Sequence, residues 1–317
     1  MPAIKKKYPE SEITWITKKN IIDLIKENPY ITNLRTINEE INDKFNILYN
    51  FDFDEEACKL TEEIRADKKY GFYSEGNYPK VFNSGAEYYL NTIFDDELKR
   101  KNKKTYQEMI FELAEIHYNK EYCPIFLNDE DKRYAEDFIR KNNINKDRLI
   151  GIHMGSSPRW PSKVWAENKL KEFIISATKK DYQILLFGGP DEIKKQKEFI
   201  LELKKDNIKF YQNNPNNTDR EFAALINICK KIVCADSFAL HVALALKKST
   251  VGLFFCTSFN EIEDYELLKK IVSPKLYEFF PERQDEYNEE LINSIKVDEV
   301  IDALGLNKNS ISENYKS

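Results

Sequence analysis

The chain has 317 residues, a length that corresponds to about two domains of ordinary size. Its 49 lysines and arginines are outnumbered by 54 aspartates and glutamates, which gives a net charge of −5. A nucleic-acid-binding protein is excluded, because such proteins carry a positive excess. The densest basic run, residues 99–104, is interpreted as a solvated helix end or loop.

Cysteine usage and the start of the chain bear on cellular location. The cysteines are odd in number and form no C-x-x-C pair, so neither a disulfide framework nor a zinc site is predicted. No apolar signal-peptide segment opens the chain, and the longest apolar run, 251–256, is far shorter than the about 20 residues of a spanning helix. We expect a reduced, cytoplasmic protein whose membrane contact is at most peripheral. The cysteines are Cys58, Cys123, Cys229, Cys234 and Cys256.

The first part of the chain, residues 1–146, predicts an amino-terminal α/β domain. Apolar residues three or four apart place Tyr106, Ile110 and Leu113 on one helix face. The polar stretch KNNINKDR at 141–148 contains the expected domain boundary. The predicted strands are 12–16, 45–49 and 69–73, and the predicted helices are 18–28, 55–67, 85–94, 104–118 and 129–142.

The second part, residues 147–305, shows the clearer pattern, in which five apolar strands alternate with helices. Apolar strands of this kind form a parallel sheet covered on both faces, which is a doubly wound α/β fold. The polar tail 306–317 is expected to be disordered. The predicted strands are 149–154, 183–187, 208–211, 231–235 and 250–255. The predicted helices are 164–178, 191–204, 219–229, 238–247, 286–294 and 297–304.

Ligands in a doubly wound fold bind beyond the carboxyl ends of the strands. The loop after the first of these strands contains Gly155, Ser156, Ser157 and Lys163. Its glycine, hydroxyls, amides and cation suit a phosphate. Neither a P-loop nor a nucleophile elbow is present. An ordinary loop with a surface lysine remains the alternative.

Two further loops carry candidate residues. In FGGPDE, Glu192 is either a helix-start acid after Pro190 or an acceptor for a ribose diol. In ADSFALHVALAL, Asp236 ends a strand and Ser237 is predicted as the N-cap of a helix whose free amides suit a pyrophosphate. His241, one turn in, adds a donor there or packs as a core histidine.

These segments together resemble a known family. The order GIHMGSSPRWPSKVW, LLFGGPDE and EFAALINICKKIVCADSFALHVALALKKSTVGLF is similar to the carboxyl half of glycosyltransferase family 9, the ADP-heptose:lipopolysaccharide heptosyltransferase family. The likeness runs from about residue 2 to about 304 and is looser in the first half. It implies the GT-B architecture, with two Rossmann-like doubly wound domains facing a cleft.

The resemblance also implies roles for residues. Ser156 and Ser157 match the loop at the donor phosphates, and Lys163 matches the phosphate-binding lysine. Glu192 matches the acid that holds the nucleoside. The motif D-[ST]-G-x-x-H at the pyrophosphate is matched by Asp236, Ser237 and His241.

The chain departs from the family pattern at three places. Phe238 replaces the motif's glycine, and Phe255–Cys256 replaces the usual Gly-Pro after the last strand. The family's first strand and Gly-Asp loop have no counterpart before MPAIKKKYP, so the amino-terminal domain is expected to be incomplete. The family's catalytic carboxylate lies in that segment, so the catalytic residue is unassigned. Asp52 and Asp54 are candidates whose alternative is a solvated loop.

The resemblance implies an inverting transfer of a sugar, heptose being expected, from a nucleotide diphosphate donor such as ADP-heptose. The acceptor would be a hydroxyl of the lipopolysaccharide core or a similar glycan. No metal and no cofactor are expected, because the loops contain no DxD and no paired ligands. Two alternatives remain open. One is a non-catalytic relative that binds nucleotide sugar or glycan, and the other is an epimerase-like nucleotide-sugar enzyme.

Overall fold

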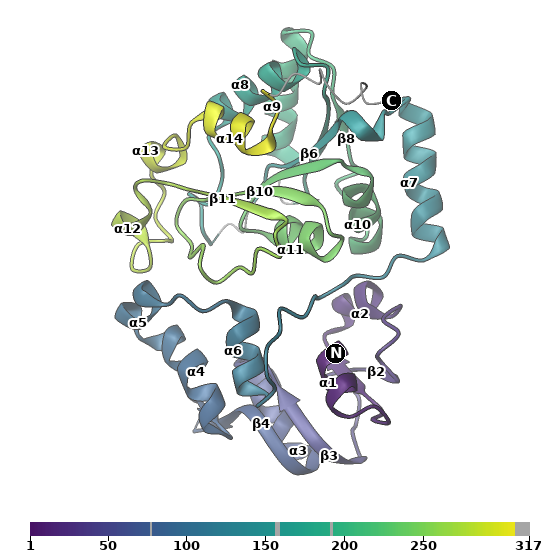
Figure 1. The fold of residues 1–317 in the computed structure, drawn as a ribbon, viewed down its shortest axis with the longest axis vertical. Helices are drawn as coiled ribbons and strands as arrows, with labels where there is room; N and C mark the ends of the chain where they lie inside the picture. Colours follow the sequence, from purple (N-terminus) through teal and green to yellow (C-terminus); the bar gives the residue numbers. More distant parts are fainter. Residues whose placement is uncertain (77, 156–158, 191–192, 308–317) are drawn as a thin grey trace, which may run out of the picture. The chain divides into compact units, whose positions relative to one another are not determined.

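The computed structural model describes residues 1–76, 78–155, 159–190 and 193–307, and it has the predicted α/β class (Figure 1). The chain divides into two compact units. Unit 1 comprises residues 1–126 and 260–263, and unit 2 comprises residues 127–259 and the chain from residue 264. The expected domain boundary at 146/147 differs from this division by the helix at 129–142, which belongs to unit 2.

Unit 1 contains two small sheets. Strands β1 and β2 form a parallel pair, and β4 pairs in parallel with β3 and antiparallel with β5. The sequence analysis did not predict β2 and β5, both of which are only four residues long. The elements are α1 (Pro2–Lys7), β1 (Thr14–Thr17), α2 (Lys19–Ile25), β2 (Asn33–Thr36), β3 (Lys44–Asn50), α3 (Glu55–Glu63), β4 (Arg65–Glu75), β5 (Tyr78–Val81), η1 (Ser84–Ala86), α4 (Glu87–Phe94), α5 (Asp96–Lys101) and α6 (Tyr106–Leu113).

Polar side chains brace unit 1 from within. Asn83 accepts a hydrogen bond from the Gly71 amide at 3.0 Å and donates one to the Leu113 carbonyl at 3.0 Å, which ties β4 to the end of α6. Gly71 has φ +94° and its Cα faces the Asn50 carbonyl so closely that a Cβ would lie 1.8 Å from the oxygen. This crossing of backbones therefore requires glycine.

The four residues 260–263 contribute two buried carboxylates to unit 1. The Tyr106 amide donates to the Glu261 carbonyl at 2.8 Å, and the Tyr118 hydroxyl donates to the Glu263 carboxylate at 2.9 Å. Both glutamate side chains are buried. A buried carboxylate is costly without partners. The Tyr118 hydroxyl is such a partner for Glu263, and the Asn102 side-chain amide donates to the Glu261 carboxylate at 3.5 Å.

Unit 2 is built on one six-stranded parallel sheet in the order β11-β10-β9-β6-β7-β8. Four of its strands were predicted closely, and the predicted strand 208–211 overlaps β8 at Tyr211 only. Strand β11, whose sequence is LKKIV, was missed because two lysines interrupt its apolar residues. The elements are α7 (Asp129–Asn142), η2 (Lys146–Arg148), β6 (Leu149–His153), α8 (Glu167–Thr178), β7 (Gln183–Phe187), α9 (Ile193–Lys205), β8 (Tyr211–Gln212), α10 (Asp219–Ile228), β9 (Lys231–Ala235), α11 (Phe238–Ala245), β10 (Ser249–Phe254), β11 (Leu268–Val272), α12 (Leu276–Phe279), α13 (Glu289–Ile292) and α14 (Val297–Leu304).

Helices cover both faces of this sheet, as Figure 1 shows: α8, α9 and α14 lie over one face, and α10 and α11 over the other. The chain first builds β6, β7 and β8 in one direction and then returns to place β9, β10 and β11 on the other side of β6. The predicted doubly wound topology is therefore confirmed for this unit.

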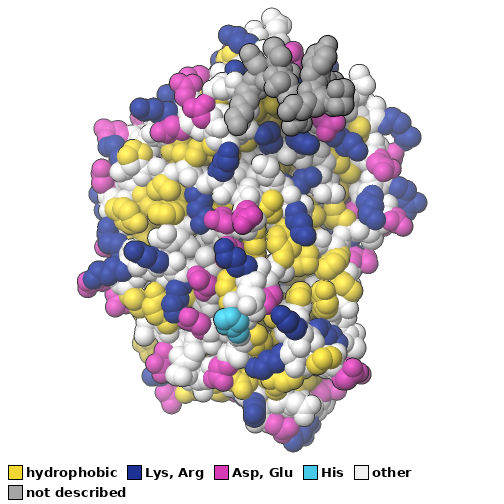
Figure 2. Space-filling model, viewed as in Figure 1, with side chains coloured by type: hydrophobic (Ala, Val, Ile, Leu, Met, Phe, Trp, Pro, Cys, Tyr) yellow, Lys and Arg dark blue, Asp and Glu magenta, His cyan; other side chains and the backbone are white. Residues whose placement is uncertain are grey.

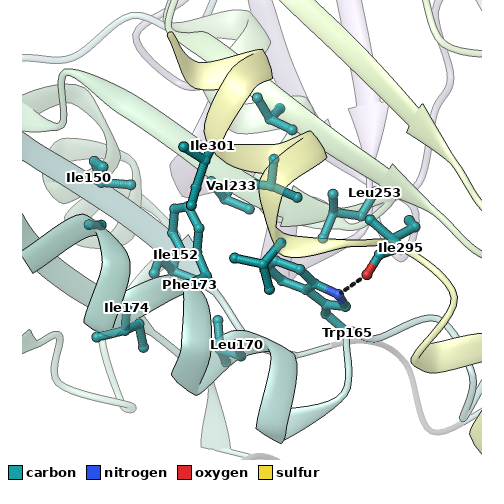
Figure 3. Packing of buried hydrophobic residues seen from close by; sticks show 14 of the residues in the cluster. Ile150, Ile152, Trp165, Leu170, Phe173, Ile174, Val233, Leu253, Ile295 and Ile301 are labelled. Atoms are coloured by element: carbon teal, nitrogen blue, oxygen red, sulfur yellow. Dashed lines mark hydrogen bonds between the residues drawn. The ribbon is translucent and has the colours of Figure 1, made fainter. Parts of the chain in front are cut away.

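The core of unit 2 lies between the sheet and helices α8 and α14 (Figure 3). Phe173 of α8 and Ile152 of β6 are almost completely buried there. The indole of Trp165 packs at 6.0 Å from the Phe173 ring and donates a hydrogen bond to the Ile295 carbonyl at 3.2 Å. That bond satisfies the only polar atom of the tryptophan side chain, which is what allows its burial.

Helix α7 is held in unit 2 by a buried ion pair. The Arg220 guanidinium on α10 contacts both carboxylate oxygens of Asp131, and both side chains are 7% exposed. Asp131 also closes the capping box of α7 with Asn128. This contact is why the helix belongs with the residues that follow it.

No described helix is long and apolar enough to cross a membrane. Acidic and basic side chains are interspersed over the face drawn in Figure 2, in keeping with the near balance of charge in the composition.

Candidate functional site

The strand order of unit 2 reverses between β6 and β9. In a doubly wound sheet this reversal opens a crevice at the carboxyl ends of the two strands, and ligands bind there. A small cavity occupies this position. Its lining includes His153 at the end of β6, Gly155 just after it, and Cys234 and Ala235 at the end of β9. The predicted residues that the structure describes follow these same two strands.

Lys163 and Asp236 form an ion pair at this edge. The Lys163 Nζ lies 3.1 Å from Asp236 Oδ2, and the two side chains are 11% and 15% exposed. The ammonium also lies 4.7 Å from the centroid of the Trp160 ring. An aromatic face and a carboxylate thus hold the cation in one place, which makes it a fixed positive charge at the strand ends.

The turn that carries Lys163 is anchored from a distant part of unit 2. The Ser162 hydroxyl donates to the Glu286 carbonyl and accepts from the Asn288 amide, both at 2.8 Å. Ser162 is itself completely buried. The position of the ammonium therefore depends on the segment just before α13 as well as on its own loop.

His241 lies one turn into α11, with Nε2 4.0 Å from Asp236 Oδ1. About half of its side chain is exposed. Desolvation lowers the pKa of His241, Asp236 opposes this effect, and Lys163 adds to it. Asp236 therefore stands between two nitrogen groups, Lys163 on one oxygen and His241 on the other.

Ser237 occupies the N-cap position of α11, as predicted, but its hydroxyl makes no capping bond. It lies instead 3.3 Å from Nδ1 of His153 at the end of β6. Burial lowers the pKa of His153 to about 4, so this imidazole is neutral at pH 7. The first-turn amides of α11 are thus not capped by the Ser237 side chain, which suits an anion at the helix start.

Three predicted residues, Ser156, Ser157 and Glu192, lie outside the described residues. The turn just before Glu192 is described, and Asn213 braces it. The Asn213 side chain accepts from the Gly188 amide at 3.0 Å and donates to the Gly188 carbonyl at 3.1 Å. Sequence reasoning missed Asn213, because nothing at position 213 distinguishes it from the neighbouring asparagines.

Sequence reasoning also missed an aromatic cluster beside the ion pair. Phe222 of α10 is its centre, with ring centroids 5.1 Å from Phe187, 5.7 Å from Phe238 and 6.0 Å from His153. Phe222 is buried, whereas Phe238 is 43% exposed. The departure of Phe238 from the family motif was the signal that could have drawn attention to this group.

The remaining candidates lie elsewhere or are buried. Cys256 is fully buried after β10, where burial raises its pKa to about 11 while the nearby Lys163 acts to lower it. Asp52 and Asp54 are exposed in the loop between β3 and α3 of unit 1, where the Asp52 carboxylate accepts from the Asp54 amide at 2.9 Å. Among the described residues, no group of three or more His, Cys, Asp or Glu is placed to hold a metal ion.

The fold and these strand-end groups define a doubly wound α/β protein with a candidate anion site at its switch point. The family model of glycosyltransferase family 9 (heptosyltransferase) matches residues 64–291, well over half of the chain. The chain therefore belongs to glycosyltransferase family 9, as the resemblance implied.

Curated relatives carry the same family's names. Over 201 residues, the chain is 33% identical to lipopolysaccharide heptosyltransferase 2 of Salmonella typhimurium, a match covering 60% of this chain and 51% of that protein. Over 177 residues, it is 27% identical to lipooligosaccharide heptosyltransferase 2 of Haemophilus influenzae, covering 50% of each. The chain thus spans about half the length of the curated relatives it matches.

Solved structures share the fold at low identity. A glycosyltransferase of family 9 from Veillonella parvula superposes with a TM-score of 0.74 at 17% identity, covering 96% of this chain and 90% of that one. ADP-heptose lipopolysaccharide heptosyltransferase II of E. coli gives a TM-score of 0.65 at 15% identity, covering 96% and 91%. These likenesses confirm the expected GT-B fold class.

Proposed function

We propose that this chain is a glycosyltransferase that transfers a sugar from a nucleotide diphosphate donor to a glycan hydroxyl. The donor is ADP-heptose, and the acceptor is a lipopolysaccharide core or a similar glycan. One observation carries the proposal: the ion pair of Lys163 and Asp236, with His241 beside it, lies at the switch point next to the start of α11.

The diphosphate of the donor is the group this arrangement suits. Lys163 supplies a fixed positive charge, and the helix start supplies amides and the positive end of the helix dipole. His241, whose side chain is about half exposed, supplies a ring nitrogen beside the other carboxylate oxygen of Asp236. Asp236 positions both groups, because its two oxygens face Lys163 and His241 separately.

Sugar transfer by this route is a single displacement with inversion. The acceptor oxygen forms a bond to the anomeric carbon while the bond from that carbon to the diphosphate oxygen breaks. The hydroxyl proton passes to a carboxylate base, a role we assign to no residue. Negative charge grows on the departing nucleoside diphosphate, and Lys163, His241 and the α11 amides stabilise it without a metal ion.

A second candidate is a relative that binds nucleotide sugar and does not turn it over. Phe238 favours it, because the family motif has glycine at this position and a bulky side chain at the first residue of α11 restricts how closely a diphosphate approaches the amides. The two candidates share a donor site and differ only in turnover.

The first test measures ADP binding by calorimetry in Lys163→Ala and His241→Ala. A charge-assisted hydrogen bond contributes about 1.5–3 kcal/mol, so we expect each variant to bind roughly 10- to 150-fold more weakly. Lys179→Ala is the matched control. Lys179 is exposed at the C-terminal end of α8, and this helix runs from the carboxyl end of β6 back to the amino end of β7, away from the candidate site. Unchanged affinity in both site variants, with the fold intact by circular dichroism, contradicts the site.

The second test follows release of ADP from ADP-heptose with acceptor glycan, in EDTA and in MgCl₂. We expect acceptor-dependent release in both. Binding without release identifies the non-catalytic candidate. A strict requirement for Mg²⁺ or Mn²⁺ contradicts the metal-independent step.

A further inference from the structure

Phe238 is an exposed aromatic residue at an unusual place. It is the first residue of α11, directly after Asp236 and Ser237, and 43% of its surface is accessible. Its ring is not a loose surface side chain, because it packs on Phe222 with centroids 5.7 Å apart and planes tilted by 33°. The supported ring therefore presents its remaining surface at the edge where ligands of this fold bind.

The contacts of the Phe238 ring show which strands it lies near. Phe222, on which it packs, contacts His153 at the end of β6 and Phe187 at the end of β7. Asp236 directly follows β9, and β6 and then β7 lie on one side of β9 in the sheet order. The aromatic cluster therefore extends from Asp236 toward the ends of β6 and β7.

The rings that make up the aromatic cluster carry no charge at neutral pH, and the turn beside them is held by hydrogen bonds. Its members are three phenylalanines and one imidazole that is neutral at pH 7. The adjoining turn carries no side chain at Gly188, and Asn213 fixes its backbone through two hydrogen bonds. A flat, neutral, π-rich group fits this chemistry better than a puckered sugar covered with hydroxyls.

We propose that Phe238, supported by Phe222, forms a stacking shelf for the nucleobase of the donor. The inference rests on the proposed function and adds a specificity-determining residue to it. With the diphosphate at Lys163 and the start of α11, the nucleoside extends over β6 and β7, and the base lies against the Phe238 ring.

The test compares two ligands by calorimetry, ADP and inorganic pyrophosphate, because only ADP carries a base. Stacking of a base on an aromatic ring corresponds to about a 5- to 150-fold change in affinity on truncation. We expect Phe238→Ala to weaken ADP binding by that factor and to leave pyrophosphate binding within about twofold. Phe238→Tyr keeps the ring and should retain ADP affinity. Phe94→Ala, another exposed phenylalanine, is the matched control.

The other possible results overturn either the stacking shelf or the proposed function. Equal losses for ADP and pyrophosphate overturn the shelf, since the ring would then act on the diphosphate site. Unchanged ADP binding in Phe238→Ala, with wild-type binding intact, overturns the shelf and leaves the proposed function standing. Absence of ADP binding in the wild-type chain overturns the proposed function itself.

Discussion

The two units of the chain bury their strands to different extents. In unit 2, strands such as β6 and β9 are buried at four of five positions, and a continuous apolar cluster joins them to α8 and α14. In unit 1, β1 is half-buried along its whole length, and β3 is buried at one residue only. Unit 1 has a smaller core and is additionally held by partly buried polar contacts, among them those of Asn83 and Glu263.

This difference bears on where a precise site can be built. The candidate donor site lies at the ends of the fully buried strands, whose positions are fixed by close packing on both faces. A charge such as Lys163 can then be held by a few additional contacts. In unit 1 the same precision depends on single hydrogen bonds, so individual polar substitutions should matter more there.

The largest expected effect is in the core of unit 2. Phe173→Ala removes a ring that is completely buried between the sheet and α14, and such truncations cost about 3–5 kcal/mol because they lose apolar contact and leave a cavity. Hydrogen exchange measured by mass spectrometry should show this loss in peptides of unit 2.

The control lies on the same helix. Glu172→Ala removes an exposed side chain whose partner Lys169 is 3.7 Å away, and we expect a change below about 0.5 kcal/mol. A loss below about 1 kcal/mol for Phe173→Ala would mean that the apolar cluster does not hold unit 2, and the contrast between the units would disappear.

The next effect depends on pH and concerns His153. Its pKa is about 4 in the folded chain and about 6.5 when unfolded, so between these values the unfolded chain binds more protons. Stability therefore falls as pH decreases from 6.5 to 4, by about 3 kcal/mol from this group.

The measurement is the free energy of unfolding in urea at pH 7 and pH 4.5. His153→Gln should show a smaller decrease than the wild-type chain, because glutamine does not titrate. His117→Gln, an exposed histidine of unit 1, serves as the control and should follow the wild-type curve. Parallel curves for all three proteins would show that the His153 imidazole is not the cause.

The sequence predicted unit 2 more completely than unit 1, and the reason is physical. Strands buried on both faces appear as continuous apolar runs, such as LIGIH and KIVCA, so the doubly wound sheet was evident. The short strands β2 and β5 were missed, because NLRT and YPKV carry no comparable pattern. In β11 two lysines obscured the apolar residues.

The candidate site was predictable where a motif carried it. Lys163, Asp236 and His241 were identified from the resemblance, and the structure places them together. Asn213 and Phe222 were not, since their roles arise from contacts between elements distant in sequence. The Ser237 hydroxyl was expected to cap α11 and instead contacts His153, a neighbour that only the sheet order reveals.

The smallest expected effect is that of Asn83→Ala, which tests whether unit 1 unfolds independently of unit 2. Asn83→Ala leaves the Gly71 amide and the Leu113 carbonyl without their partner, at an expected cost of about 1–3 kcal/mol. Because both groups lie in unit 1, hydrogen exchange should accelerate in peptides of unit 1 and remain unchanged in those of unit 2. Asn46→Ala, at an exposed position on β3, is the matched control. Equal acceleration in both units would show that they unfold together, so that the small core of unit 1 is not an independent weak point.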